Sequence, residues 1–429
     1  MTSETTPDAT GAATADPSPE APPRHPAWRT AAFYAALYAA FGAHLPFWPL
    51  WLADWGLTEA EIGAYAAAGF AARILAGGII PVIADRRQAR RTTLGLVGAL
   101  AAATFLAHLA IDSRALLLAA TLVTVGCMSA LVPVGDALSV AAARSFGFAY
   151  GRARAAGSAA FLLVNLGLGA ALGSLGTDAA LWTIALCLAA AAWLGWTHPG
   201  GGRVQSGPRP TMAELRRLAT APAFALFALA AGLAQASHGA FYAYASLHWR
   251  SLGVPEGTIG ALWAFGVAVE VALMLTVGSR LVLWLKPSGA LALAGAAGVA
   301  RWGLMTLGAT GPLLWALQGS HAVTFAVAHL GAMAFLGAAC PVRLAGAGQA
   351  VFQVAFGGLL MAGATALAAA VYPVAGGAVW WTAAGFSAAA VVVALSARRI
   401  WDGAELPVAP RLPAAPAGAS FAREPGDRP

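Results

Sequence analysis

The stretch Trp55-Gly-Leu-Thr-Glu59-Ala-Glu-Ile62-Gly63-Ala64 has a second copy later in the chain, Leu252-Gly253-Val-Pro-Glu256-Gly-Thr-Ile259-Gly260-Ala261. The copies are offset by 197 residues (252 minus 55), and at the same offset Gly69 matches Gly266. Each copy joins the first apolar segment of one half of the chain to the second. The sequence therefore predicts a protein built from two repeated halves in parallel orientation.

The composition around the repeat is that of a membrane protein. Of the 429 residues, 59% are hydrophobic and 10% are charged, whereas soluble domains have about 45–50% apolar and about 25% charged residues. This excludes a soluble enzyme, a disordered regulator and a nucleic-acid-binding protein as leading interpretations, despite a net charge of +7.

Apolar runs long enough to cross a bilayer, about 20 residues each, recur in both halves. We predict an all-α membrane protein with 12 transmembrane helices in two pseudo-symmetric six-helix bundles. The predicted spans are 28–54, 60–84, 92–111, 115–143, 152–175, 179–197, 222–249, 257–284, 288–308, 312–337, 344–371 and 375–397.

Basic residues orient these spans, because Lys and Arg accumulate on the cytoplasmic side. Two of them, Arg114 and Arg250, fall in the connections on one side. Eighteen fall on the other side, together with both termini: Arg24, Arg29, Arg86, Arg87, Arg90, Arg91, Arg144, Arg152, Arg154, Arg203, Arg209, Arg216, Arg217, Arg280, Lys286, Arg343, Arg398 and Arg399. We therefore expect both termini to be cytoplasmic.

The longest connection divides the spans six and six. We predict a disordered tail over 1–27, an N-terminal bundle over 28–197, a cytoplasmic linker over 198–221, a C-terminal bundle over 222–397 and a disordered tail over 398–429. The linker contains a short amphipathic segment around Met212 to Leu218.

Ionisable residues inside membrane spans are costly and indicate function by default. Asp136, Glu270 and His321 are the candidate proton carriers. Arg73 maps onto Glu270 at the repeat offset, so opposite charges occupy equivalent positions of the two halves. These two residues either meet near the pseudo-twofold axis or face a cavity separately, and an interhelical salt bridge is the structural alternative for Arg73.

Polar and aromatic residues recur at helical spacing in the predicted first, seventh and tenth spans. Together they describe a cavity for a small organic molecule with an apolar body and a polar or anionic end. His329 has the alternative role of bonding to a neighbouring helix. The candidate substrate-binding residues are His44, Phe47, Gln235, His238, Tyr242, Tyr244, His248, Trp263, Arg301, Gln318, His321, Phe325 and His329.

The two six-helix halves are typical of the major facilitator superfamily. The segment Asp85-Arg86-Arg87-Gln-Ala-Arg90-Arg91 also resembles the conserved cytoplasmic loop of that superfamily. The resemblance implies gating contacts there, and the gating or charge-pair candidates are Arg73, Asp85, Arg86, Arg152 and Arg154. This copy departs from the family pattern, since Pro81 replaces the glycine before the acid and the later glycine is missing.

Several further segments resemble a narrower branch, the 3-phenylpropionic acid permease-like transporters near the nucleoside and oligosaccharide proton symporters. These segments are Pro46-Phe-Trp-Pro49-Leu-Trp-Leu, Tyr150-Gly-Arg152-Ala-Arg154-Ala-Ala-Gly157-Ser158, His238-Gly-Ala-Phe-Tyr242, His248-Trp249, Ile259-Gly260-Ala-Leu-Trp263 and Gln318-Gly-Ser-His321. The resemblance implies secondary transport of a small aromatic or related organic acid.

Lactose-permease-like relatives carry acids on helices 4 and 8, an arginine on helix 9 and a histidine on helix 10. Asp136, Glu270, Arg301 and His321 match that placement, but Thr324 stands where those relatives have a glutamate. The resemblance therefore shifts the expected proton carrier to Glu270, Asp136 or His321.

The chain lacks a phosphate-binding Walker loop, because its single lysine, Lys286, is followed by proline. We therefore expect no cofactor and no metal, and an ion gradient, with protons favoured, as the energy source. The expected partners are a small-molecule substrate, protons and the lipid bilayer. We expect the protein to be a monomer that crosses the bacterial inner membrane several times. Alternatives are a nucleoside or sugar symporter, an exporter of amphipathic compounds, and a membrane enzyme or assembly factor without transport.

Overall fold

The computed structural model describes residues 24–201 and 210–407, and within these ranges every regular element is a helix. The predicted tails and linker fall partly outside them, at residues 1–23, 202–209 and 408–429. The first group of elements, before the linker, comprises α1 (Pro26–Asp54), α2 (Glu59–Arg86), α3 (Arg90–Ala107), η1 (His108–Ala110), α4 (Arg114–Phe146), α5 (Tyr150–Leu175) and α6 (Asp178–Trp196).

The linker ends in α7 (Met212–Thr220), where the amphipathic pattern predicts a helix. The second group then comprises α8 (Pro222–Ala236), α9 (Gly239–Ser251), α10 (Glu256–Thr276), α11 (Gly278–Met305), α12 (Gly311–Gly319), η2 (Ala322–Val327), α13 (Ala328–Ala339), η3 (Val342–Leu344), α14 (Ala345–Val351), η4 (Phe352–Gly358), α15 (Leu359–Ala375), η5 (Gly376–Val379) and α16 (Trp380–Ile400).

Helix starts and stops follow local chemistry. The Thr58 hydroxyl accepts a hydrogen bond from the Glu61 amide while the Glu61 carboxylate accepts one from the Thr58 amide, which is a complete capping box at the start of α2. α4 ends at Gly147, whose φ of 69° lies in the left-handed region that favours glycine. The repeated stretch of the sequence therefore contains the turn between α1 and α2 and the cap of α2.

Several predicted spans are interrupted. The predicted seventh span is divided between α8 and α9 at Ser237 and His238, and the tenth contains the π-helical segment η2 between α12 and α13. α11 covers the end of the predicted eighth span and the ninth up to Met305, with a kink at Lys286, where φ is 59°. Within the described residues, ten ranges are long and apolar enough to cross a membrane, so the count of twelve stays a prediction.

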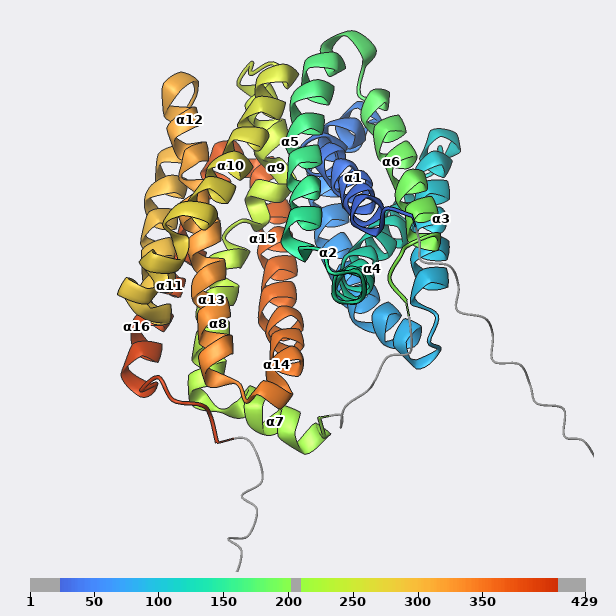
Figure 1. The fold of residues 1–429 in the computed structure, drawn as a ribbon. Coiled ribbons are helices and arrows are strands. Elements are labelled where there is room, and N and C mark those ends of the chain that lie inside the picture. Colours follow the sequence, from blue (N-terminus) through green and yellow to red (C-terminus); the bar gives the residue numbers. More distant parts are fainter. Residues whose placement is uncertain (1–23, 202–209, 408–429) are drawn as a thin grey trace, which may run out of the picture.

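The helices form two groups on either side of a central division (Figure 1). In the first group α1 packs on α5 and α6, and α2 packs on α4. In the second group α16 packs on α8 and α11. Contacts between the groups are concentrated in the pairs α2 with α15, α5 with α10 and α1 with α9.

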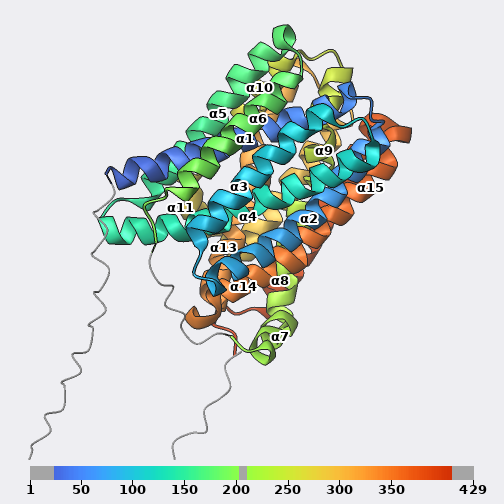
Figure 2. The ribbon, with the colours of Figure 1, turned by 90° about the vertical axis from the view of Figure 1, so that its right-hand side faces the viewer.

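The end of the molecule near α7, here the α7 end, also holds the end of the described chain (Figure 2). The Arg343 guanidinium forms an ion pair with Glu214 of α7, which holds this helix against the start of η3. Trp401 packs edge-on against Phe227 and Phe335. The predicted tail boundary at 398 therefore falls inside α16, which continues to Ile400.

The opposite end closes the division between the two groups. The Arg250 guanidinium lies 2.9 Å from the Asp54 carboxylate, and the Tyr244 hydroxyl donates to the Glu59 carbonyl at 2.8 Å. Gly260 lies so close to α5 that an added Cβ would be 2.2 Å from the Asn165 carbonyl oxygen. We call this the closed end.

Candidate functional site

A cavity of about 410 Å³, the central cavity, lies between the two groups of helices. The first group contributes aromatic residues of α1 and a cation of α5. The second contributes aromatic and polar residues of α9, α10, α12 and η2. The walls include Tyr38, Phe41, Arg154, Phe241, Tyr242, Trp263, Glu270, Gln318, His321 and Phe325.

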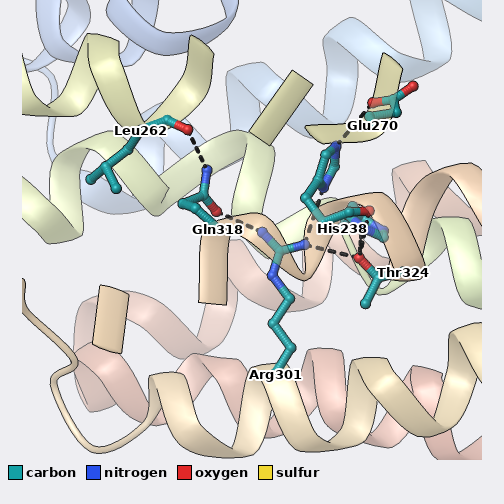
Figure 3. A network of polar contacts seen from close by, with 7 residues as sticks. His238, Leu262, Glu270, Arg301, Gln318 and Thr324 are labelled. Carbon is teal, nitrogen blue, oxygen red and sulfur yellow. Dashed lines mark hydrogen bonds and ion pairs between the residues drawn. The ribbon is translucent and has the colours of Figure 1, made fainter. Parts of the chain in front are cut away.

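Arg301 of α11 organises the polar wall of the central cavity from behind (Figure 3). Its side chain is 1% exposed, and its guanidinium donates to the Gln318 amide oxygen at 2.7 Å, the Thr324 hydroxyl at 3.0 Å and His321 Nδ1 at 3.1 Å. The Gln318 amide nitrogen in turn donates to the Leu262 carbonyl at 3.2 Å. A planar guanidinium with several donors suits such divergent acceptors.

The contacts of His321 determine which of its nitrogens carries the proton. Nδ1 accepts from Arg301, so a neutral His321 carries its proton on Nε2. Nε2 lies 3.6 Å from the Glu270 carboxylate, which faces the cavity. The structure thus brings together three of the predicted residues, Glu270, Arg301 and His321.

His238 lies one hydrogen bond further from the cavity. Its Nδ1 lies 3.2 Å from the Ala234 carbonyl and its Nε2 lies 3.2 Å from the Thr324 hydroxyl. The Thr324 hydroxyl accepts from Arg301 and donates to the His321 carbonyl at 3.3 Å, so it links His238 to both of these residues. His238 is fully buried, and its ring also packs against His321 and Phe325 of the cavity wall, with ring centroids 5.4 and 5.9 Å away.

A second cavity, of about 840 Å³, adjoins the central cavity and reaches the residues of α14, near the α7 end. We call it the lower cavity. It is lined by six predicted residues, Arg73, Asp136, Gln235, Glu270, Phe325 and His329, of which Glu270 and Phe325 also line the central cavity. Arg73 and Glu270 thus face one cavity, and no ion pair joins them among the described residues.

Asp136 and Arg154 are held by tyrosines of the first group. The Asp136 carboxylate accepts from the Tyr34 hydroxyl at 2.5 Å and from the Tyr150 hydroxyl at 3.2 Å. Arg154 donates to the Tyr38 hydroxyl, and its guanidinium carbon lies 4.0 Å from the Tyr38 ring centroid. Arg154, a predicted gating residue, also lines the central cavity.

Three predicted substrate-binding residues, Phe47, Tyr244 and His248, lie away from both cavities, and a fourth, His44, lines a separate pocket. Phe47 is fully buried in the core, and Tyr244 bonds across the closed end to the Glu59 carbonyl. His248 packs against Tyr372 and Trp380.

Among the remaining gating candidates, Asp85 forms an ion pair with Arg90. Arg86 and Arg152 are exposed.

Two titratable groups outside the spans are strongly perturbed. Burial, with a smaller effect of the nearby Arg91 and Arg29 charges, lowers the pKa of His198 to about 3. Hydrogen bonds from Arg343 and Thr211 lower the pKa of Glu214 to about 2. Both groups help to fix the ends of the linker, His198 on the first group and Glu214 on the second.

Sequence reasoning missed the tyrosines of α1. Tyr34, Tyr38, Phe41 and Leu45 are spaced by four, three and four residues, which places them on one helical face. That spacing in the sequence indicates a shared helical face and could have identified these tyrosines. No cluster of three or more His, Cys, Asp or Glu suited to a metal ion occurs in 24–201 and 210–407.

Comparison with known proteins gives two matches over most of the chain. A sequence model of the MFS_1 like family matches residues 27–388. A protein of Escherichia coli (strain K12) described as a probable 3-phenylpropionic acid transporter is 32% identical over 315 residues, covering 70% of this chain and 79% of that protein.

Solved structures share the fold at low sequence identity. A point mutant of the nucleoside transporter NupG superposes with a TM-score of 0.77 at 13% identity, over 86% of this chain and 99% of NupG. An auto-inhibited POT family peptide transporter superposes with a TM-score of 0.65 at 13% identity, over 88% and 97%. The chain therefore belongs to the MFS_1 like family, and it is a multi-pass membrane transporter of the major facilitator type for a small molecule.

Proposed function

We propose that this transporter imports a small aromatic organic acid together with protons across a bacterial inner membrane. Its two groups of helices enclose the central cavity, and contacts at the closed end separate that cavity from one side. Alternating access then requires the contacts of the closed end to break while the α7 end closes. With both termini in the cytoplasm, as the arginine distribution predicts, the described conformation faces inward.

The pair Glu270 and His321 is the observation that carries proton coupling. Glu270 borders both cavities, so a proton on its carboxylate is exchangeable with water there. The neighbouring His321 Nε2 and the fixed charge of Arg301 behind it make the local electrostatics depend on whether Glu270 is protonated. Asp136 is a weaker candidate, because two tyrosine hydroxyls already hold its carboxylate.

The walls of the central cavity support an aromatic substrate. Phe241 and Trp263 lie with ring centroids 4.8 Å apart, and Tyr242 stacks on Trp263 at 6.2 Å. Such flat surfaces favour offset stacking with a ring of the substrate. The E. coli relative, described as a probable 3-phenylpropionic acid transporter, points to the same class.

Uptake into proteoliposomes tests this function. Vesicles containing the protein are given an inward proton gradient and a panel of labelled aromatic acids, nucleosides and sugars. We expect gradient-dependent accumulation of an aromatic acid such as 3-phenylpropionate, and loss of that accumulation when the gradient is collapsed. Accumulation of nucleosides or sugars alone, or export of amphipathic compounds in place of uptake, would overturn the proposal.

A further inference from the structure

A third, smaller pocket lies within the first group of helices. It has a volume of about 60 Å³ and is lined by residues of α1, α2 and α4 together with Tyr242 of α9. Tyr242 also lines the central cavity, and Arg73 also lines the lower cavity. We call it the side pocket. It therefore adjoins both compartments through which a substrate would move.

The side pocket has polar groups without protein partners. His44 is 6% exposed, and neither of its ring nitrogens has a hydrogen-bond partner in the described part of the chain. The indole nitrogen of Trp48 is buried and unpartnered as well. A buried polar group without a partner costs free energy, about 1–3 kcal/mol by mutational measurements. Both side chains line the pocket, so a ligand there could satisfy them.

Arg73 supplies a positive charge to the side pocket, and the pocket lining contains no Asp or Glu. The guanidinium carbon of Arg73 lies 5.1 Å from the Phe70 ring centroid, and no described carboxylate forms an ion pair with it. A charge inside the membrane normally has a counter-charge or faces a substrate pathway. The charge in the lining of the side pocket is therefore positive, which favours an anionic ligand group.

The volume of the side pocket limits the size of the ligand group that can enter it. A space of about 60 Å³ holds a carboxylate group or a few water molecules, since one water needs about 10–15 Å³ by the same measure. An aromatic ring attached to that carboxylate would remain outside the pocket, beside Tyr242 and the stacked Trp263. Tyr242 lines both the side pocket and the central cavity, so the carboxylate and the ring would lie against the same side chain.

We propose that the side pocket is the anion subsite of the transporter, in which Arg73 binds the substrate carboxylate and His44 and Trp48 donate hydrogen bonds to it. This inference rests on the proposed transport of an organic anion. It assigns the carboxylate to the first group of helices and the proton to Glu270 of the second group. Substrate and proton would then be bound by opposite halves of the repeat, at the equivalent positions Arg73 and Glu270.

Formate tests the subsite without any assumption about transport, because it is a carboxylate small enough for the side pocket. The purified full-length protein is labelled with ¹⁵N in its histidine side chains, and the His44 signal is assigned with a His44→Gln variant. We expect formate to shift the His44 signal saturably in the wild type and in Arg154→Gln. The shift should be absent in Arg73→Gln and weaker in Arg73→Lys, which keeps the charge.

A second measurement compares 3-phenylpropionate with its neutral amide, 3-phenylpropanamide, in equilibrium binding. Arg73→Gln should weaken binding of the acid by about tenfold or more, the loss expected for a hydrogen bond to a charged group, and change binding of the amide little. Unfolding temperatures of the variants check that each one is folded.

The two measurements separate this inference from the proposed function. A formate shift that depends on Arg73, with no uptake or binding of aromatic acids, would leave the anion subsite standing and remove the proposed substrate. Uptake of an aromatic acid with no formate shift at His44, and a loss of acid selectivity in Arg154→Gln but not in Arg73→Gln, would overturn the subsite and place the carboxylate at Arg154.

Discussion

At the scale of single residues, Glu270 and Arg301 contribute to the site in different ways. Glu270 borders two cavities and touches His321, whereas Arg301 is buried and holds three acceptors in place. A change at Glu270 should therefore affect coupling, and a change at Arg301 should affect the shape of the site. Separate experiments distinguish the two.

Replacing Glu270 with Gln removes the exchangeable carboxyl proton and nearly preserves the side-chain volume. We expect accumulation driven by a proton gradient to fall to the level of protein-free vesicles, while exchange of labelled for unlabelled substrate across the membrane continues. The same substitution at the exposed Glu405, outside the spans, is the matched control and should leave both activities unchanged. Gradient-driven accumulation in Glu270→Gln would show that the proton is carried elsewhere.

Replacing Arg301 with Lys keeps the charge but removes the planar arrangement of donors. Three donors on one ammonium cannot reach Gln318, Thr324 and His321 from the same position, so at least one buried acceptor loses its partner. We expect a loss of about 1.5–3 kcal/mol in stability, measured by thermal unfolding, and a raised KM for uptake. An unchanged unfolding temperature and KM would mean that the network does not depend on the guanidinium.

The sequence pointed to charged and to several neutral residues of the candidate site, such as Gln318, but not to Thr324. Asp136, Glu270 and Arg301 are conspicuous because charges are rare in apolar spans. Thr324 accepts from Arg301 and contacts His238, yet a threonine in a membrane helix is common and carries no comparable signal. The partners of a buried charge depend on helix rotation, which one sequence leaves open.

At the scale of elements, the linker helix α7 is held by the Glu214 carboxylate and by its buried Leu218, which packs in the core of the second group. The Glu214 carboxylate accepts hydrogen bonds from the Thr211 amide and hydroxyl, closing a capping box, and pairs with Arg343 of η3. The amphipathic sequence predicted α7, but nothing in it indicated Arg343 as the partner. The interrupted spans were not predicted either, because the π-helical segments η2 and η4 are as apolar as their neighbours.

The contacts of the Glu214 carboxylate with Thr211 and Arg343 should depend on pH. Its pKa in the folded protein, about 2, lies below the usual value of 4.5, so its contribution to stability is present above about pH 4.5 and is lost as the pH falls toward 2. We expect amide hydrogen exchange in α7 to be faster in Glu214→Gln than in the wild type at pH 7. The difference should shrink on acidification. Equal exchange in the wild type and the variant at pH 7 would contradict a role of Glu214 in holding α7.

At the scale of the whole molecule, the repeat predicted the division into two groups of helices, but not which end is closed. The closed end depends on pairs between the groups, such as Asp54 with Arg250 and Tyr244 with Glu59. The proposed alternating access requires these pairs to break, so a sequence compatible with both conformations contains no direct signal for one of them.

The Asp54 and Arg250 pair should bias the conformational equilibrium modestly, because both side chains are partly exposed. Such pairs contribute about 0.2–1 kcal/mol, so Asp54→Asn should increase the population open at this end by about fivefold at most. Exchanging the charges, with Asp54→Arg and Arg250→Asp together, should restore the original population.

Spin labels at Ser174→Cys and Leu252→Cys, on either side of the closed end, would report the distance distribution. The native cysteines Cys127, Cys187 and Cys340 are first replaced. The pair would play no part in closure if Asp54→Asn left the distance distribution unchanged. The same would follow if exchanging the two charges did not restore the original distribution.

The opposite charges at the equivalent positions Arg73 and Glu270 decide whether the two halves are interchangeable. A protein made of two copies of the first half would place two arginines around one cavity, and two copies of the second half would place two carboxylates there. Like charges so confined repel and would shift each other's ionisation. The two halves are therefore not interchangeable at this pair of positions, because each supplies the charge that the other lacks.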